Sequence, residues 1–382
     1  MRGSIASIGG AGALTACLLG GAVAAPAAAD TALLAPLAVM PDGSLRPDVG
    51  VLVDDDGVVR RVTTADELAD HPNARRLPEG SVLSPGMIDL ASFAGVWRAN
   101  ISAGDTIDPD TSVIDGFDPH GPGVSAALEA GITALMLAPS MNGLVDGACA
   151  TVRTAPGRDG SHVLDPACAM AMTMGEPAFS TTLGPFTRSG AMPVLREVLA
   201  AAADAPDSRL GRVVSGDMPV VALVTEPEDA SAMLRLLGRV GVVPTLVHTV
   251  DALDIAEEVG AAGGAVIVGP YDMSAEPRVL AGAAALADAG ARVAFRAGLP
   301  ATGPERLRLT AALAVRHGLA PEAARRGLTS EAAAIAGVAD RIGSIAVGRH
   351  ADFVVFSGDP LRLDSTVLEV HVAGRPAHRA GD

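Results

Sequence analysis

Short apolar runs recur through the middle of the chain and alternate with stretches of helical periodicity. Neighbouring runs begin roughly 20 to 30 residues apart, which suits one strand and one helix per repeat. The runs are rich in Val, Ile, Leu and Ala and lack polar alternation, as is typical of strands covered on both faces. The pattern therefore predicts an α/β fold with a parallel sheet, whose strands include residues 220–224, 244–248, 265–268 and 293–295.

Two architectures fit this repeating region. Residues 83–339 are about as long as an eight-stranded βα barrel requires. A doubly wound open sheet has the same local signature, so periodicity alone leaves both architectures open. The helices expected between and after the strands lie at 124–130, 227–240, 251–259, 279–289, 307–316 and 321–336.

Both ends of the chain have short strand-like runs separated by turns. Residues 31–82 contain a Pro-Asp-Gly turn at 41–43 and an acidic turn that ends at Gly57. The chain returns to strand-like runs at 352–356 and 367–372. Because neither end is long enough to bury a core alone, we expect residues 31–82 and 340–378 to form one small composite β-sandwich.

Charge and composition exclude several classes of function. The net charge is −16, so the surface repels nucleic acid and anionic lipid. Aromatic residues make up only 2% of the chain, too few for base-stacking platforms. All 28 basic residues are arginine, and a chain without lysine cannot form a Schiff base, a Walker-type phosphate loop or a carboxylated-lysine metal bridge. We expect no nucleic-acid partner.

The first 29 residues resemble an export signal. Between Arg2 and Asp30 there is no charged residue, and residues 27–29 form an Ala-x-Ala cleavage site. We therefore expect a signal peptide at 1–29 and a periplasmic or extracellular protein. A membrane anchor, a lipid-bearing Cys17 within a lipobox-like Leu-Thr-Ala-Cys, and a misassigned start codon are the alternatives.

Removal of residues 1–29 would leave two cysteines, Cys149 and Cys168. In an oxidising compartment they could pair. The alternative is two buried apolar thiols, which we favour because one pair does not make a disulfide framework.

Five segments of the chain have the form of known motifs: Asp340–Pro360, Ser84–Asp89, Ala127–Pro139, Asn142–Gly147 and Met174–Pro177. The first three resemble the carboxy-terminal signature, the entry into the first barrel strand and a helix-strand segment of the amidohydrolase superfamily. The last two resemble motifs of its imidazolonepropionase-related branch. The resemblance covers residues 31–378. It implies a (β/α)8 TIM-type barrel with a β-sandwich formed by both termini, and metal-dependent hydrolysis of C–N bonds in cyclic amides or related substrates.

The metal ligands that the resemblance implies are largely replaced in this chain. The His-x-His positions carry Ala91 and Phe93, a mid-barrel histidine position carries Leu223, and the aspartate position after the last strand carries Gly298. His248 alone matches a ligand position, whereas a catalytic zinc site uses three protein ligands. We therefore expect no metal, no cofactor and no catalytic residues of the family type.

Three residues remain as pocket candidates. His248 ends a predicted strand and either binds a ligand or makes an ordinary structural hydrogen bond. Arg296 follows the last predicted strand and either recognises a carboxylate or forms a surface ion pair. Asp89 is expected to support the turn after the first barrel strand. The other histidines show no ligand spacing and are interpreted as structural or solvated: His71, His120, His162, His317, His350, His371 and His378.

The sequence thus predicts an exported amidohydrolase-like protein that has lost metal-dependent hydrolysis and binds a small ligand or a partner chain. The partner would be a second copy of the chain or an active amidohydrolase relative. One alternative is an active hydrolase that acts on C–N bonds other than peptide bonds through an altered site. A purely structural exported protein is the other.

Overall fold

The computed structural model describes residues 30–96, 106–179, 184–248 and 252–381, except for the side chain of His248. The predicted signal peptide, with Cys17, lies outside the described residues.

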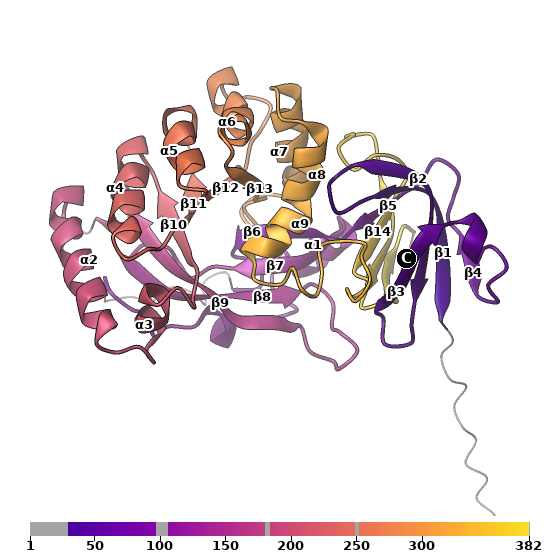
Figure 1. The fold of residues 1–382 in the computed structure, drawn as a ribbon, viewed down its shortest axis with the longest axis horizontal. Coiled ribbons are helices and arrows are strands. Elements are labelled where there is room, and N and C mark those ends of the chain that lie inside the picture. Colours follow the sequence, from indigo (N-terminus) through magenta and orange to yellow (C-terminus); the bar gives the residue numbers. More distant parts are fainter. Residues whose placement is uncertain (1–29, 97–105, 180–183, 249–251, 382) are drawn as a thin grey trace, which may run out of the picture.

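A sheet of eight strands forms the centre of the molecule (Figure 1). Its hydrogen-bonded path runs from β13 through consecutive strands to β6. The two end strands approach each other, because Phe93 N donates to Leu299 O at 3.0 Å just beyond them. The sheet is therefore nearly closed and barrel-like. Its strands are β6 (Met87–Ser92), β7 (Ile132–Leu137), β8 (Val145–Arg153), β9 (Val163–Met174), β10 (Val220–Val224), β11 (Thr245–His248), β12 (Ala265–Val268) and β13 (Arg292–Phe295).

Helices cover the outside of this sheet, and the larger ones stand in a row along its outer face (Figure 1). Three of them, α4, α6 and α8, begin with proline, whose fixed φ suits the first turn and whose missing N–H costs nothing there. The helices are α1 (Val124–Glu129), α2 (Arg188–Ala203), α3 (Arg209–Val214), α4 (Pro227–Gly238), α5 (Ala256–Ala261), α6 (Pro277–Asp288), α7 (Glu305–Arg316), α8 (Pro321–Leu328) and α9 (Ser330–Ile335). Short 3-10 turns are η1 (Asp66–Leu68), η2 (Val113–Gly116), η3 (Glu176–Ala178) and η4 (Ala252–Ile255).

The strand β8 departs from the predicted (β/α)8 pattern. It runs antiparallel to both β7 and β9, whereas the other neighbouring pairs in this sheet are parallel. The links from Leu137 to Val145 and from Arg153 to Val163 are too short to carry a crossover helix, so the chain must turn back on itself at both places. The mixed α/β architecture holds, but a helix does not follow every strand.

The inside of the barrel-like sheet is filled by apolar side chains. Ile88, Met136, Val221, Val247 and Ile267 belong to one fully buried cluster, together with residues of α9. Close packing of this kind makes the interior a core rather than a pore.

A second sheet combines strands from both ends of the chain. It follows the order β16-β15-β14-β5-β1-β2-β3, with β4 paired to β1. The sheet curls so that Arg75 in β4 reaches Glu369 in β15, although these strands are not neighbours. We call it the terminal sheet. Its strands are β1 (Thr31–Val39), β2 (Leu45–Val53), β3 (Val59–Thr64), β4 (Ala74–Arg76), β5 (Val82–Pro85), β14 (Phe353–Phe356), β15 (Val367–Val372) and β16 (Arg375–Arg379).

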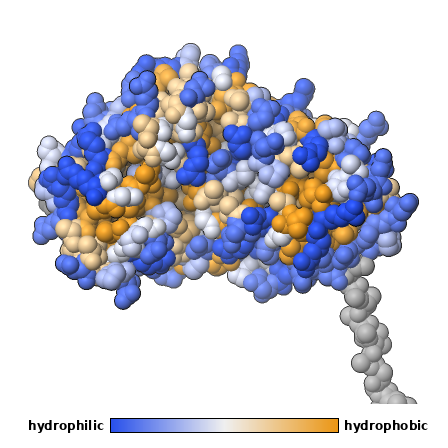
Figure 2. Space-filling view, in the orientation of Figure 1, coloured by the Kyte–Doolittle hydropathy of each residue, from blue (hydrophilic) through white to orange (hydrophobic). Residues whose placement is uncertain are grey.

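The two sheets share buried contacts. Arg153 of β8 donates from Nε to Asp352 Oδ2 at 2.8 Å, and both side chains are buried. Val354, Phe356 and Val370 of the terminal sheet belong to the same apolar cluster as the outer face of the barrel. On the face seen in Figure 2, hydrophilic side chains predominate, with apolar areas between the helices and over the terminal sheet. In the described part of the chain, no helix is both long and apolar enough to cross a membrane.

Candidate ligand site at the mouth of the barrel

The closure of the central sheet brings Asp89 and Arg296 together. Asp89 lies in β6, and Arg296 follows β13 directly. The pairing of β6 with β7 is interrupted between Asp89 and Ser92, and Ala91 within this bulge has a φ of 48°. Bulges of this kind redirect side chains at the rim of a barrel.

The Asp89 carboxylate is completely buried and links the two ends of the sheet through a hydrogen bond. Its Oδ1 accepts a hydrogen bond from the backbone N–H of Ala297 at 2.6 Å. Burial raises the pKa of Asp89 to about 6, although the hydrogen bond from Ala297, the Ser92 hydroxyl and the charge of Arg296 oppose this rise. The residue thus supports the loop after β13, rather than only the turn after its own strand.

The Arg296 guanidinium is a buried cation at the same place. Its side chain donates from Nη2 to the carbonyl oxygen of Ala91 at 3.1 Å, and the residue is 9% exposed. Burial lowers the pKa of Arg296 and the nearby Asp89 carboxylate raises it. The buried Nε–H has no hydrogen-bond partner among the described residues. Arg296 therefore forms no surface ion pair, and it retains an unused donor.

The four replaced ligand positions surround an apolar end of the barrel. Ala91 is fully buried in the inner cluster, and Phe93 and Leu223 pack against that cluster. Gly298 has a φ of +83°, and a Cβ atom there would lie 3.0 Å from Cγ of Pro270. An aspartate at position 298 would therefore be strained in this backbone.

His248 is the last residue of β11, so its backbone lies at the same end of the sheet as Arg296. Its side chain lies outside the described part of the structure, and its predicted role as a pocket residue stays a prediction. The structure thus brings together Asp89, Ala91 and Arg296 among the candidates.

Asp146, which is not among the three pocket candidates, is a second buried carboxyl. Its Oδ1 accepts from the backbone N–H groups of Asn142 and Gly143 at 2.8 and 2.6 Å, and its Oδ2 accepts from Thr173 Oγ1 at 2.8 Å. Burial raises the pKa of Asp146 to about 6. The Asn-Gly-Leu-Val-Asp-Gly motif therefore forms a turn that packs against β9. This packing becomes visible only through the contact with Thr173 in the folded structure.

The residues present do not fit a catalytic divalent ion. Hard and borderline cations need several carboxylate, imidazole or thiolate ligands, whereas four of the family's ligand positions at this end of the barrel carry Ala, Phe, Leu and Gly. Within the described residues, no group of three or more His, Cys, Asp or Glu is placed to hold a metal. The buried guanidinium of Arg296 would moreover repel such an ion.

The sequence model of the Amidohydrolase family matches residues 188–378, half of the chain. The chain belongs to the amidohydrolase family. The finer assignment to the imidazolonepropionase-related branch stays a prediction. No curated protein matches the chain.

Solved structures share the fold of this amidohydrolase-family protein. An amidohydrolase from Thermotoga maritima is 24% identical, with a TM-score of 0.79 over 91% of this chain and 100% of the other. A prolidase from Bifidobacterium longum, described as putative, is 15% identical, with a TM-score of 0.55 over 93% and 96%. A zinc-bound adenosine deaminase from Xanthomonas campestris is 18% identical, with a TM-score of 0.55 over 91% and 92%. At these identities the likeness concerns the fold alone.

Proposed function

We propose that this amidohydrolase-family protein binds a small ligand at the mouth of its barrel and does not carry out metal-dependent hydrolysis. The observation that supports this most directly is the buried guanidinium of Arg296, which donates to the carbonyl oxygen of Ala91 and feels the charge of the Asp89 carboxylate. The chain itself thus supplies a cation beside Ala91, one of the positions where the family resemblance implies a metal ligand.

Electrostatics favour this proposal over a metal-dependent enzyme. A guanidinium stays protonated in proteins, so the positive charge of Arg296 is permanent even though burial lowers its pKa. The charge of Arg296 would repel a divalent ion nearby, because buried surroundings screen charges poorly. The ion would also lose hydration to the apolar surroundings of Ala91, Phe93 and Leu223 without gaining ligands in return.

The same residues indicate which kind of ligand the site would bind. The unused Nε–H of Arg296 suits a carboxylate or a carbonyl oxygen, and the apolar side chains of Phe93 and Leu223 suit a compact apolar body. His248, which ends β11 at the same end of the sheet, is the further polar residue that we include in this proposed site.

Metal analysis of the purified protein, combined with a hydrolysis screen, tests the proposal. We expect less than stoichiometric zinc, manganese or iron, and no turnover of lactams, cyclic imides, amides or esters. The screen is repeated with added metal and with a chelator. A stoichiometric divalent metal, together with turnover that the chelator abolishes, would show that the proposal is wrong.

The alternative is an active hydrolase that acts on C–N bonds other than peptide bonds without a metal. Its motivation is the Asp89 carboxyl, whose pKa of about 6 is suitable for proton transfer near neutral pH. Turnover that survives chelation and is lost in His248→Ala would favour this alternative. His317→Ala, on the outer α7–α8 connection, is the matched control.

A further inference from the structure

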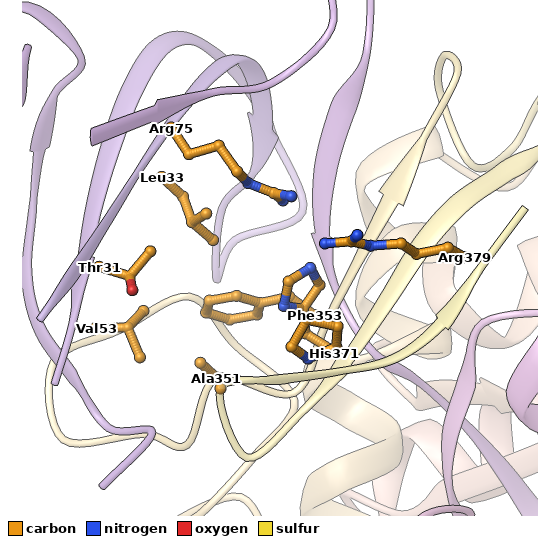
Figure 3. Close-up of a pocket in the computed structure, with 10 residues that line it drawn as sticks. Thr31, Leu33, Val53, Arg75, Ala351, Phe353, His371 and Arg379 are labelled. Atoms are coloured by element: carbon orange, nitrogen blue, oxygen red, sulfur yellow. The ribbon is translucent and has the colours of Figure 1, made fainter. Parts of the chain in front are cut away.

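A separate cavity lies within the terminal sheet, away from the barrel mouth. Its volume is about 180 Å³, and strands from both ends of the chain line it (Figure 3). Leu33, Val53 and Phe353 provide an apolar floor, whereas Arg75, His371 and Arg379 provide a basic side. An apolar cavity of about 150 Å³ is large enough for one benzene ring. The cavity can therefore hold a compact body of that size.

Glu369 holds two of the three basic groups in place. Arg75 donates from Nη1 to Oε1 at 3.0 Å and from Nη2 to Oε2 at 2.6 Å. His371, two residues further along β15 and on the same face, donates from Nε2 to Oε2 at 3.0 Å. Both carboxylate oxygens of Glu369 are thus already engaged.

Arg379 is left without an anion. This exposed arginine lies directly opposite Glu369 in the pairing of β15 with β16, yet within the described residues Glu369 pairs with Arg75 and His371 and Arg379 forms no ion pair. Figure 3 shows the guanidinium groups of Arg75 and Arg379 turned toward each other at the edge of the cavity.

The charges around the cavity do not cancel. Arg75 and Arg379 contribute two positive charges and Glu369 one negative charge, while burial lowers the pKa of His371 and keeps it neutral near pH 7. One positive charge remains in excess. Two guanidinium groups that face each other repel, and an anion between them would remove the repulsion.

We propose that this cavity is a binding site for a small organic monoanion, a carboxylate carried on a compact apolar body. The carboxylate lies between Arg75 and Arg379, and the apolar body rests on Leu33, Val53 and Phe353. The site is independent of the one proposed at the barrel mouth, so either proposal can fail without the other.

Calorimetric titration with benzoate and with its neutral isostere benzamide tests the charge requirement. We expect benzoate to bind at least roughly tenfold more tightly than benzamide, because a charge-assisted hydrogen bond is lost with the carboxylate. Inorganic phosphate is the third probe and should bind more weakly than benzoate, because it has no apolar body. Equal binding of benzoate and benzamide, no detectable benzoate binding, or phosphate binding as tight as benzoate would each overturn the proposal.

Variants on one exposed strand locate the site. Arg379→Gln is expected to weaken benzoate binding roughly tenfold or more. Arg375→Gln changes an exposed arginine of the same strand that does not line the cavity, and it should leave binding unchanged. Unchanged binding in Arg379→Gln, or an equal loss in both variants, would overturn the assignment. Thermal unfolding of both variants verifies that they remain folded.

Discussion

Two buried carboxyl groups link the stability of the fold to pH. Burial raises the pKa values of Asp89 and Asp146 from 3.8 to about 6. Between pH about 4 and about 6 the native state therefore binds more protons than the unfolded state, so stability falls as pH rises. Each group costs roughly 3 kcal/mol once it is ionised. Glu369 affects stability in a different, more acidic range of pH. Hydrogen bonds from Arg75 and His371 outweigh the effect of burial and lower its pKa to about 2.

Asp89→Asn is expected to flatten this pH dependence. The amide oxygen can still accept from Ala297 N, whereas the titration of position 89 is removed. The thermal midpoint of the variant should fall by about half as much as that of the native protein between pH about 4 and about 6, since Asp146 still titrates. Thermal unfolding followed by circular dichroism across this range measures the effect. A variant whose midpoint changes with pH as steeply as in the native protein would contradict the assignment of the shift to Asp89.

At the scale of elements, the strands that sequence patterns predicted well are those with short, purely apolar runs. The predicted strands at 220–224 and 265–268 coincide with β10 and β12. Such runs are visible because burial on both faces demands apolar residues at every position.

The strand β8 could not be predicted in this way. Its sequence Val-Asp-Gly-Ala-Cys-Ala-Thr-Val-Arg mixes small and polar residues, although every one of them is buried. Its polar members are satisfied by distant partners: Asp146 by Thr173, Thr151 by the carbonyl oxygen of Ala336, and Arg153 by Asp352. These partners become visible only once the fold has formed. The same holds for Arg75, which reaches Glu369 only because the terminal sheet curls.

The buried ion pair between β8 and the start of β14 is expected to be a sensitive point of the fold. Asp352 accepts from Arg153 Nε at 2.8 Å and, through Oδ1, from Ala373 N at 2.7 Å. Asp352→Ala leaves a buried guanidinium and a buried N–H without partners, so we expect a loss of about 3–5 kcal/mol in the free energy of unfolding.

Urea denaturation measures this loss against a matched control. Asp364→Ala removes the carboxylate of the Arg362–Asp364 pair, whose side chains are 68% and 68% exposed. That change should cost less than about 1 kcal/mol. Similar losses in the two variants would mean that the buried pair has no special role.

At the scale of the whole molecule, we expect the two sheets to unfold as one cooperative unit, because they share buried apolar surface. The outer apolar cluster of the barrel includes Val354, Phe356 and Val370 from the terminal sheet. The Arg308 guanidinium of α7 lies 5.1 Å from the centre of the Phe356 ring, and its Nε donates to the carbonyl oxygen of Pro360 at 2.7 Å. Because neither sheet can bury this surface alone, loss of one exposes the core of the other.

Phe356→Ala should therefore weaken both sheets together. The side chain is fully buried, and its removal is expected to cost about 3–5 kcal/mol. Hydrogen exchange should accelerate by a similar factor in β1 and β2 of the terminal sheet and in β10 and β11 of the barrel, because these amides exchange through global unfolding. Leu363→Ala, at a side chain that is 59% exposed, should change hydrogen exchange neither in the terminal sheet nor in the barrel. Acceleration confined to the terminal sheet, with the barrel amides still protected, would show that the sheets unfold independently.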